Sequence, residues 1–422
     1  MAFDGTTMTE SESGCRLRIL AIHRYYWPDT PPYASMLRSI VARWAGEGHR
    51  VEVLSTQPSY KPGAGIPRQP AVEQLDRVRV CRLSLPMEAG RPIIRIFNLV
   101  LFSLAILRYA LIRGKFDVIM ASTAPPVFIG AAARLAARLT GAKFIYHCMD
   151  IHPEIGRISG EFSNPLLFSG LQRIDAKSCR VAARVVVLSR DMAEVIRTRK
   201  HCRDAKVEII NNFNLPSFES VGQGEVPAEL TKDDGVFRLL FAGNLGRFQG
   251  LETVIDAMHY LSDLPNVELV FMGEGKAVDS LRQRAADLHG GKVKFFPHQP
   301  VDFARAVIRS ADLCLVSLMP GIFRYAFPSK TMAYLGEGRP LLVSVEPESE
   351  LAEFVRNNQI GVTVIPGDVI GIADTIRVLV GDIPGQREMV VRARAAGEAY
   401  FSEPVVLDRW SKLMEIIAGE VK

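Results

Sequence analysis

The sequence predicts two doubly wound α/β domains in tandem, and three observations support this prediction. The chain has 422 residues, which is too long for one compact core. Short runs rich in Val, Ile and Leu alternate with longer helix-like stretches, a pattern typical of parallel sheets that are covered on both faces. This pattern occurs twice, on either side of a stretch rich in Pro, Gly and acidic residues.

The expected boundaries follow from this pattern. We expect a disordered tail over 1–15, a first domain over 16–214, a linker over 215–235, a second domain over 236–395, and a C-terminal helix over 396–422 that crosses back to the first domain. Two such domains facing a cleft would bind ligands at the carboxyl ends of their strands. The expected strands are 16–22, 51–55, 78–83, 117–122, 143–147, 184–189 and 207–211, then 237–243, 267–273, 293–296, 311–318, 340–345 and 361–365.

The composition indicates a globular protein that is not specialised for nucleic acid. Hydrophobic residues make up 48% of the chain, and 51 basic against 46 acidic residues leave a net charge of only +5. The six cysteines lie far apart without a CxxC pair, which favours reduced thiols over a zinc site. Residues 1–15 lack the basic start and apolar core of a signal peptide, so we expect a cytoplasmic protein.

The segment 91–115, "RPIIRIFNLVLFSLAILRYALIRGK", is strongly apolar with basic flanks. It could be a buried core helix, a membrane span, or an interfacial helix on an anionic leaflet. We favour the interfacial helix, because the apolar run is slightly short for a span and is interrupted by polar residues. The side chains expected at the membrane are Arg95, Phe97, Phe102, Arg108 and Arg113.

A glycine-rich turn follows the first strand of the second domain, in "FAGNLGRFQGLETVIDAM" (241–258). The strand is expected to end at Gly243 and a helix to begin near Leu251. Glycines let the backbone approach a ligand, and the loop amides together with the helix start favour an anion. Arg247 adds a permanent positive charge suited to phosphate. The alternative is an ordinary turn with a solvated arginine.

A second anion site is predicted in "GIFRYAFPSKTMAYLGEGRP" (321–340). Pro328 precedes a helix start, and Ser329 is the expected N-cap. Lys330 would then stand beside the free amides of the first turn, where a diphosphate would satisfy both. The alternative is a capped helix with a surface lysine. Two anion sites in one domain favour a nucleoside diphosphate as ligand.

Two stretches of the first domain carry acceptor-side candidates. Tyr33 and Ala34 follow a Pro-rich turn and are expected near the cleft. The loop "YHCMDIHPEIGR" (146–157) follows a strand and collects polar side chains at its carboxyl end, where a reaction site is expected. Each of them could instead cap a helix or form a structural ion pair. The residues concerned are Asp150, His152 and Glu154.

These motifs, taken in order, resemble the retaining glycosyltransferases of family 4, which have the GT-B fold. The resemblance covers nearly the whole chain, from "YYWPDTPPYASMLRSI" and "GHRVEVLS" through "DIHPE", "NNFN" and "FAGNLGRFQGLETVIDAM" to "PSKTMAYLGEGRPLLVS" and "SELAEFVRNNQIGVTVIPGD". The variants "YYWPDTPPYASM", "GNLGRFQG" and "PSK" look most like the bacterial surface-polysaccharide subgroup, which acts on lipid-linked or oligosaccharide acceptors at the inner membrane.

The resemblance implies a role for each matched position. Asp150, His152, Arg247 and Lys330 would act at the reaction centre, the two cations by neutralising the leaving diphosphate. Tyr33, Ala34 and Glu154 would lie on the acceptor side. The nucleotide sugar would lie near Gly243, Asn244, Arg247, Gln249, Ser329, Lys330 and Glu350.

The sequence also departs from the family. Tyr325 and Ala333 stand where many members have two glutamates, and Asn244 and Gln249 stand where the phosphate-binding Arg and Lys are usual. The ribose and the diphosphate must therefore be held differently.

The function that the resemblance implies is transfer of a sugar, with retention, from a nucleoside diphosphate sugar to a lipid-linked acceptor. A UDP-linked N-acetylated hexosamine is the expected donor, and no metal or other cofactor is expected. We expect peripheral attachment to the cytoplasmic face of the inner membrane and no nucleic-acid partner. The alternatives are a nucleotide-sugar epimerase and a catalytically silent assembly subunit of the same fold.

Overall fold

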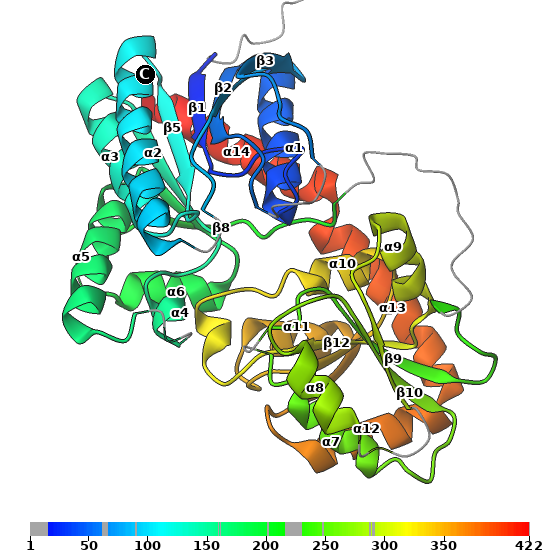
Figure 1. Ribbon diagram of the computed structural model, residues 1–422. Helices are drawn as coiled ribbons and strands as arrows, with labels where there is room; N and C mark the ends of the chain where they lie inside the picture. The colour runs from blue at the N-terminus through cyan, green and yellow to red at the C-terminus, as the bar shows by residue number, and fades with distance from the viewer. Residues whose placement is uncertain are drawn as a thin grey trace, which may run out of the picture. The chain divides into compact units, whose positions relative to one another are not determined.

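The computed structural model describes residues 16–60, 66–88, 91–158, 160, 162–200, 202–215, 230–246, 249–286, 288 and 292–421. It divides into two compact units, Met1–Tyr146 with Leu407–Lys422, and His147–Val406 (Figure 1). The expected tail 1–15 and most of the expected linker lie outside the described residues, as does Arg247.

The first sheet has eight strands in the order β3-β4-β2-β1-β5-β6-β7-β8. Its central strands are buried on both faces, which is why they read as continuous apolar runs in the sequence. In β1, Ile19 lies opposite Val51 on one side and Val118 on the other, both in parallel pairing. The strands are β1 (Arg18–Ile22), β2 (Arg50–Thr56), β3 (Val72–Leu75), β4 (Val78–Leu83), β5 (Val118–Ser122), β6 (Lys143–Cys148), β7 (Arg184–Val187) and β8 (Val207–Ile209).

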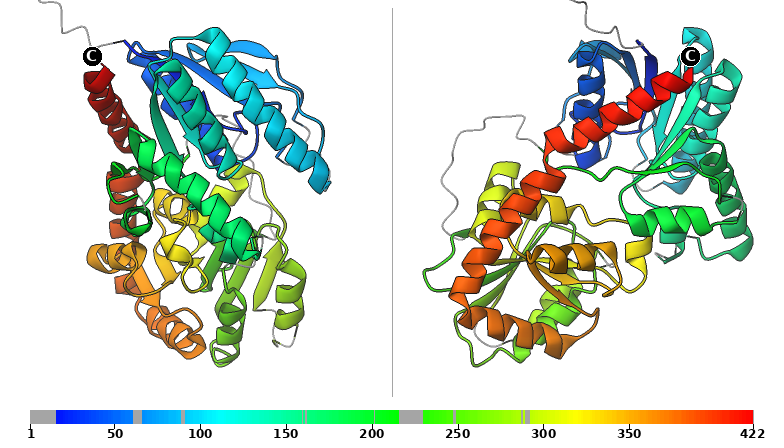
Figure 2. Two further views of the ribbon diagram at one scale, coloured as in Figure 1. Left: turned by 90° about the vertical axis from the view of Figure 1, so that its left-hand side faces the viewer. Right: turned by 180° about the vertical axis from the view of Figure 1, so that it is seen from behind.

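Helices connect these strands, and the C-terminal helix packs beside α1. Trp410 on that last helix packs edge to face against Trp44 on α1, with 5.8 Å between ring centroids, and both rings are buried. Helix α2 lies alongside α3 (Figure 2, left). The helices are α1 (Pro32–Gly46), α2 (Pro92–Arg113), α3 (Phe128–Thr140), α4 (Glu154–Ile158), α5 (Pro165–Val181), α6 (Arg190–Thr198) and α14 (Glu403–Val421).

The second sheet has six parallel strands in the order β11-β10-β9-β12-β13-β14. From β9, successive strands are added first on one side (β10, β11) and then on the other (β12, β13, β14). The boundary between β9 and β12 is therefore the switch point, where open α/β sheets bind ligands. The strands are β9 (Phe237–Ala242), β10 (Val267–Met272), β11 (Val293–Phe296), β12 (Leu313–Ser317), β13 (Leu341–Ser344) and β14 (Gly361–Val364).

Two hydrophobic clusters, one on each face of the second sheet, hold its helices in place. Helix α13 packs against α10, α11 and α12 and is seen from behind in Figure 2 (right). The helices are α7 (Glu252–His259), α8 (Val278–Ala285), α9 (Val301–Ser310), the 3₁₀ turn η2 (Ile322–Arg324), α10 (Lys330–Gly336), α11 (Glu350–Asn358), α12 (Val369–Gly381) and α13 (Ile383–Phe401).

The predicted fold class, two α/β domains with parallel sheets, is confirmed. Every expected strand range overlaps a strand of the structure. Strand β3 was not expected. It pairs antiparallel with β4 through a tight turn in which Asp76 and Arg77 take positive φ angles of 52° and 64°. Such hairpin turns are usually predicted from an Asn-Gly or Asp-Gly pair, and the Asp-Arg pair here does not predict one.

Candidate functional site

The loops that follow β9 and β10 lock together through backbone contacts. Leu245 N donates to Glu274 O at 2.8 Å. A Cβ on Gly273 would lie 2.0 Å from Gly243 O, and one on Gly275 would lie 2.0 Å from Leu245 O. Both positions therefore require glycine, because any side chain would collide with the neighbouring backbone. The glycine-rich turn predicted from the sequence is thus one half of a paired loop at the switch point of the second sheet.

Lys330 lies directly against this loop. A Cβ on Gly243, which has φ +122°, would lie 3.0 Å from Lys330 Cε. The Lys330 ammonium lies 4.5 Å from the centroid of the Phe241 ring, on β9. Among the described residues, no carboxylate contacts Lys330 Nζ. Burial alone lowers the pKa of Lys330 from 10.5 to about 8. The structure therefore brings Gly243 and Lys330 together, and it leaves the cation without a counter-charge in the protein.

Ser329 does not cap α10 in the way the sequence suggested. It holds the N-cap position, but its backbone is helical and its side chain makes no capping hydrogen bond. Ser329 is exposed as a residue, and its hydroxyl is not used as a cap. The helix is instead fixed by Tyr334, whose buried hydroxyl accepts from Ala242 N at 2.8 Å and lies 3.2 Å from Ala242 O. This contact ties α10 to the end of β9 and so sets the position of Lys330.

The remainder of the glycine-rich loop is held by Gln249. Gly246 N donates to Gln249 Oε1 at 2.7 Å, and Ser317 at the end of β12 donates to Gln249 O. The side chain of Asn244 lies beside the same glycine, since a Cβ on Gly246 would lie 3.1 Å from Asn244 Nδ2. Gln249 thus supports the loop from within, while the position of Arg247 falls outside the described residues.

The loop after β6 pairs with the segment that precedes Lys330. Asp150 forms an antiparallel bridge with Ala326, and Ile151 N donates to Tyr325 O at 2.7 Å. Burial raises the pKa of Asp150 to about 6. The structure therefore joins two stretches that the sequence analysis had singled out separately.

His152, next on this loop, is neutral at physiological pH. Its pKa is lowered to about 4, because burial disfavours the imidazolium. Its Nδ1 is buried without a hydrogen-bond partner in the described part of the chain. An unsatisfied buried nitrogen of this kind is available to a ligand hydroxyl.

Glu154, expected on the acceptor side, is held in a buried ion-pair cluster. Arg199 donates to Asp175 at 2.5 Å, to Glu154 Oε1 at 3.0 Å and to the His152 backbone oxygen at 2.7 Å. Gln172 also donates to Glu154 at 2.9 Å. The two carboxylates raise the pKa of Arg199 further above its usual range. The structural ion pair that the sequence left open for Glu154 is observed, and its place on the acceptor side stays a prediction.

Glu350, expected near the nucleotide, contacts the start of α6. Its carboxylate accepts from the Arg190 backbone N–H and lies 3.6 Å from Arg190 Nε, and its own N–H donates to Asp191 at 2.9 Å. Burial raises the pKa of Asp191 to about 6. In this structure Glu350 therefore joins α11 to α6, and a nucleotide would have to share its carboxylate with Arg190.

Tyr33 and Ala34, the other expected acceptor-side residues, are buried. Tyr33 is 6% exposed and Ala34 0%, because this side of α1 packs on the first sheet. The Tyr33 ring lies edge to face against His23, at 4.7 Å between centroids. His23 in turn hydrogen-bonds Ser122 through Nδ1. His23 and Ser122 were not predicted as site residues from the sequence. Each lies at the carboxyl end of an expected strand, and that position could have indicated them.

Helix α2 has one buried stripe and one exposed apolar face. Asn98, Phe102, Ile106 and Ala110 recur every four residues and are buried. Phe102 is 1% exposed, which contradicts its expected insertion into a membrane, whereas Phe97 is 53% exposed. By length and composition α2 could cross a membrane, although core helices pass the same test. The exposed apolar side chains are Ile93, Ile96, Phe97, Val100, Leu104, Leu111 and Ile112.

The arginines of α2 also divide into exposed side chains and one that pairs with the sheet. Arg95 and Arg108 are exposed. Arg113 pairs with the buried Glu52 on β2, with 3.3 Å between Nη2 and Oε1. Arg113 therefore anchors the helix to the sheet and is not free for a lipid headgroup.

In the part of the chain that the structure describes, no three His, Cys, Asp or Glu side chains are grouped so as to hold a metal ion. The expectation of a metal-independent reaction stays a prediction.

Comparisons with known proteins agree with this architecture. Residues 33–212 match the family described as "Glycosyl transferase 4-like domain", and residues 236–382 match "Glycosyl transferases group 1". The two matches cover most of the chain.

Two curated relatives extend over most of the chain at low identity. One is the probable glycosyltransferase WbjE of Pseudomonas aeruginosa, 24% identical over 79% of this chain and 82% of the relative. The other is the putative colanic acid biosynthesis glycosyl transferase WcaI of Escherichia coli K12, 25% identical over 86% of this chain and 91% of the relative.

Two solved structures share the fold. Sucrose-phosphate synthase from Thermosynechococcus elongatus superposes with a TM-score of 0.73 at 17% identity, covering 96% of this chain and 100% of that one. Anabaena HepE in complex with UDP superposes with a TM-score of 0.66 at 16% identity, covering 95% and 100%. The chain belongs to the glycosyltransferases in which a glycosyl transferase 4-like domain is followed by a glycosyl transferases group 1 domain.

Proposed function

We propose that the protein transfers a sugar from a UDP-sugar, with retention of configuration, to a lipid-linked acceptor in the synthesis of a bacterial surface polysaccharide. The observation that carries this proposal is the half-buried Lys330 beside Gly243, a cation with no carboxylate partner among the described residues. The UDP bound by HepE supports the choice of nucleotide, and the name of WcaI supports the pathway class.

In this proposal Lys330 binds the diphosphate of the donor and stabilises the charge that develops on it as the sugar leaves. Such a cation acts most strongly where water is excluded, which is also the condition that lowers its pKa. Arg247 supplies a second positive charge in this proposal, and the Ser329 hydroxyl, Asn244 and the Gly243 backbone line the phosphates. An oxygen of the leaving phosphate takes the proton of the acceptor hydroxyl on the same face of the sugar, so that no carboxylate pair is required.

The loop after β6 supplies the sugar-side contacts in this proposal. His152 Nδ1 is buried and unsatisfied, and the ring is neutral at pH 7, so it can exchange a hydrogen bond with a sugar hydroxyl. Asp150, whose pKa of about 6 leaves it mostly ionised at pH 7, accepts from a second hydroxyl. Backbone pairing between this loop and Tyr325 and Ala326 links both residues to the segment that carries Lys330.

A transfer assay tests the reaction. Purified protein is incubated with a panel of UDP-sugars, including the UDP-N-acetylhexosamines that we expect as donors, and with polyprenyl diphosphate-linked sugar acceptors. Sugar appearing on the lipid is the expected result. A changed free nucleotide sugar without transfer would indicate an epimerase. UDP-sugar binding with no turnover on any acceptor would indicate a silent assembly subunit.

We further propose that the protein attaches to the cytoplasmic face of the inner membrane through the exposed apolar face of α2. Apolar side chains flanked by the exposed Arg95 and Arg108 suit an interface with anionic lipid. The double variant Phe97→Asp and Leu104→Asp is expected to lose sedimentation with anionic vesicles while keeping its melting temperature. A matched variant of exposed apolar residues elsewhere, Val378→Asp and Val391→Asp, should still sediment. Equal sedimentation of the two variants would refute attachment through α2.

A further inference from the structure

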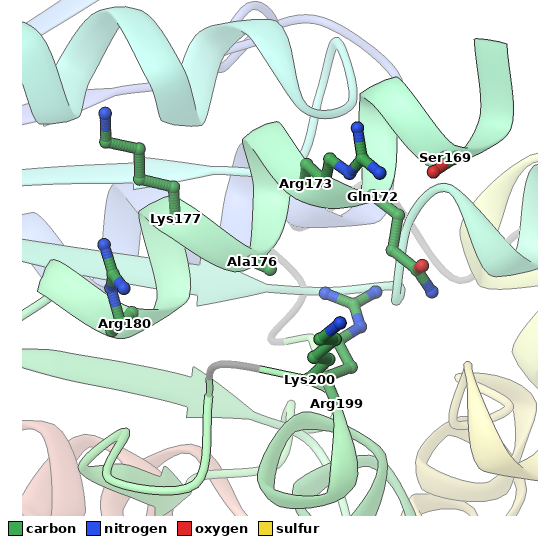
Figure 3. Close-up of a pocket in the computed structure, with 8 residues that line it drawn as sticks. All are labelled: Ser169, Gln172, Arg173, Ala176, Lys177, Arg180, Arg199 and Lys200. Carbon is green, nitrogen blue, oxygen red and sulfur yellow. The ribbon is translucent and has the colours of Figure 1, made fainter. Parts of the chain in front are cut away.

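A cavity of about 520 Å³ lies along helix α5 and is lined by basic side chains without an acidic one (Figure 3). The basic residues are Arg173, Lys177 and Arg180 on α5, and Arg199 and Lys200 at and beyond the end of α6. None of them belongs to the loops around Lys330. The transfer reaction proposed above makes no use of this cavity.

The basic residues on α5 share one face of the helix. Positions 173, 177 and 180 are spaced by four and three residues, which aligns their side chains along the helix surface. Ala176, buried between them, leaves open the space that a larger side chain would fill. Figure 3 shows Arg173 and Lys177 on α5 above Arg199 and Lys200, with Arg180 to the left of them. The cavity is therefore lined by one face of α5 and by the residues that follow α6.

The charges at the cavity are only partly compensated. Arg199 is neutralised by Glu154 and Asp175, as described above. Among the described residues, no carboxylate pairs with Arg173, Lys177, Arg180 or Lys200. Arg173, Lys177 and Arg180 repel one another along α5, since like charges at this spacing destabilise a helix face, and the exposed Lys200 lines the same cavity. Binding of a dianion would remove that repulsion.

We propose that this cavity binds a phosphate group. Arginine forks and lysine ammonium groups are the side chains that pair with phosphate oxygens, which accept several hydrogen bonds at once. The volume exceeds that of one phosphate, so there is room for part of the molecule that carries it. The phosphate can come from a lipid headgroup or from a soluble phosphate compound. Leu166, Leu167, Ile174 and Val181, exposed on the same helix, would contact acyl chains in the first case.

The test measures how fast individual lysines of the full-length protein react with an acetylating reagent, read by peptide mass spectrometry. Lys177 and Lys200 report on the cavity, and the exposed Lys412 on α14 serves as reference. Inorganic diphosphate at about ten times its Kd should slow acetylation of both cavity lysines about tenfold, since a bound lysine is shielded. Lys412 should react at an unchanged rate.

The same footprint with vesicles separates the two sources of the phosphate. Phosphatidylcholine vesicles containing phosphatidylglycerol are compared with phosphatidylcholine alone. Protection by the anionic vesicles, and not by the neutral ones, assigns the cavity to a lipid headgroup. Protection by diphosphate without protection by either kind of vesicle assigns it to a soluble phosphate compound.

Arginine variants keep both reporter lysines in place. The double variant Arg173→Gln and Arg180→Gln should lose the protection of Lys177 and Lys200 with an unchanged melting temperature, because both arginines are exposed. The matched control is Arg197→Gln with Arg203→Gln, two exposed arginines nearby that do not line the cavity, and it should keep the protection. Unprotected lysines in the wild type with both probes, or protection that survives in Arg173→Gln/Arg180→Gln, would overturn the proposal.

Discussion

Two cations inside the second unit, Arg199 and Lys330, show opposite ways of placing a charge away from water. Arg199 lies between Glu154 and Asp175 and donates to both, so that its pKa rises further. Lys330 contacts a glycine and an aromatic ring, so that its pKa falls to about 8. A buried charge that is fully paired serves the fold, whereas one that is left unpaired at a strand end is available to a ligand.

A third buried cation follows the pattern of Arg199. Arg238 on β9 pairs with Glu268 on β10 at 2.5 Å and also donates to Leu230 O at 2.9 Å. Lys294 contacts the same glutamate at 2.7 Å. These charges support neighbouring strands of the second sheet and lie away from the glycine-rich loop. The comparison therefore separates Lys330, on α10, from the structural cations of the second sheet.

The strongest test of the comparison removes the paired cation. Arg199→Met leaves Glu154 and Asp175 buried without a counter-charge, and should lower the free energy of unfolding by roughly 3–5 kcal/mol. Urea denaturation measures this change. Arg197→Met, at an exposed position of α6, should change the free energy by less than about 0.5 kcal/mol. A stability loss of the same size in both variants would show that the cluster does not hold this region together.

Removal of the unpaired cation should affect turnover instead. Lys330→Ala is expected to lower kcat/KM for the UDP-sugar by about 10²- to 10³-fold, the usual cost of removing one donor that stabilises a developing negative charge. Its melting temperature should stay near that of the wild type, because no ion pair is lost. The control is Lys294→Ala, which removes a lysine that has a carboxylate partner and should leave turnover unchanged. Wild-type turnover in Lys330→Ala would contradict the proposal that Lys330 binds the diphosphate.

The pH dependence of donor binding sharpens the comparison further. With a pKa of about 8, Lys330 is mostly protonated at pH 7 and mostly neutral at pH 9, so the Kd for UDP should rise about tenfold between these values. The terminal phosphate of UDP is mostly doubly ionised already at pH 7, so its own charge changes little over this range. The pKa is lower in the folded protein than its ordinary 10.5, so the contribution of Lys330 to stability increases as pH rises from about 8 to 10.5. Calorimetry should show a flat profile for Lys330→Ala, and a flat wild-type profile would contradict the assignment.

Much of the fold was predictable from the sequence because its strands are buried on both faces. Such strands read as apolar runs, and β1, β9 and β12 were expected within two residues of where they lie. Strand β3 was missed because it is a half-exposed edge strand that alternates weakly and turns at Asp76 and Arg77. The order of the loop motifs that resemble the family could also be taken from the sequence alone, because these motifs lie between recognisable strands.

The candidate site was only partly predictable. Gly243 and Lys330 were expected as separate anion sites, and the structure brings them into contact. Glu154, Glu350 and Arg113 were expected to meet ligands or lipid, and each is engaged by a charge from another element. A charged residue on a loop looks the same in the sequence whether or not a partner is placed opposite it.

The sequence by itself determined the two parallel sheets, the glycines at the strand end and the presence of a lysine at the start of α10. These depend on local periodicity, backbone freedom and chain order, which are properties of short stretches. Only the tertiary structure decided which charges are neutralised, that Ser329 does not cap its helix, and that four cations surround a cavity along α5. Those outcomes depend on side chains from distant segments, because a charge is stabilised or left free by what the fold brings within a few ångströms of it.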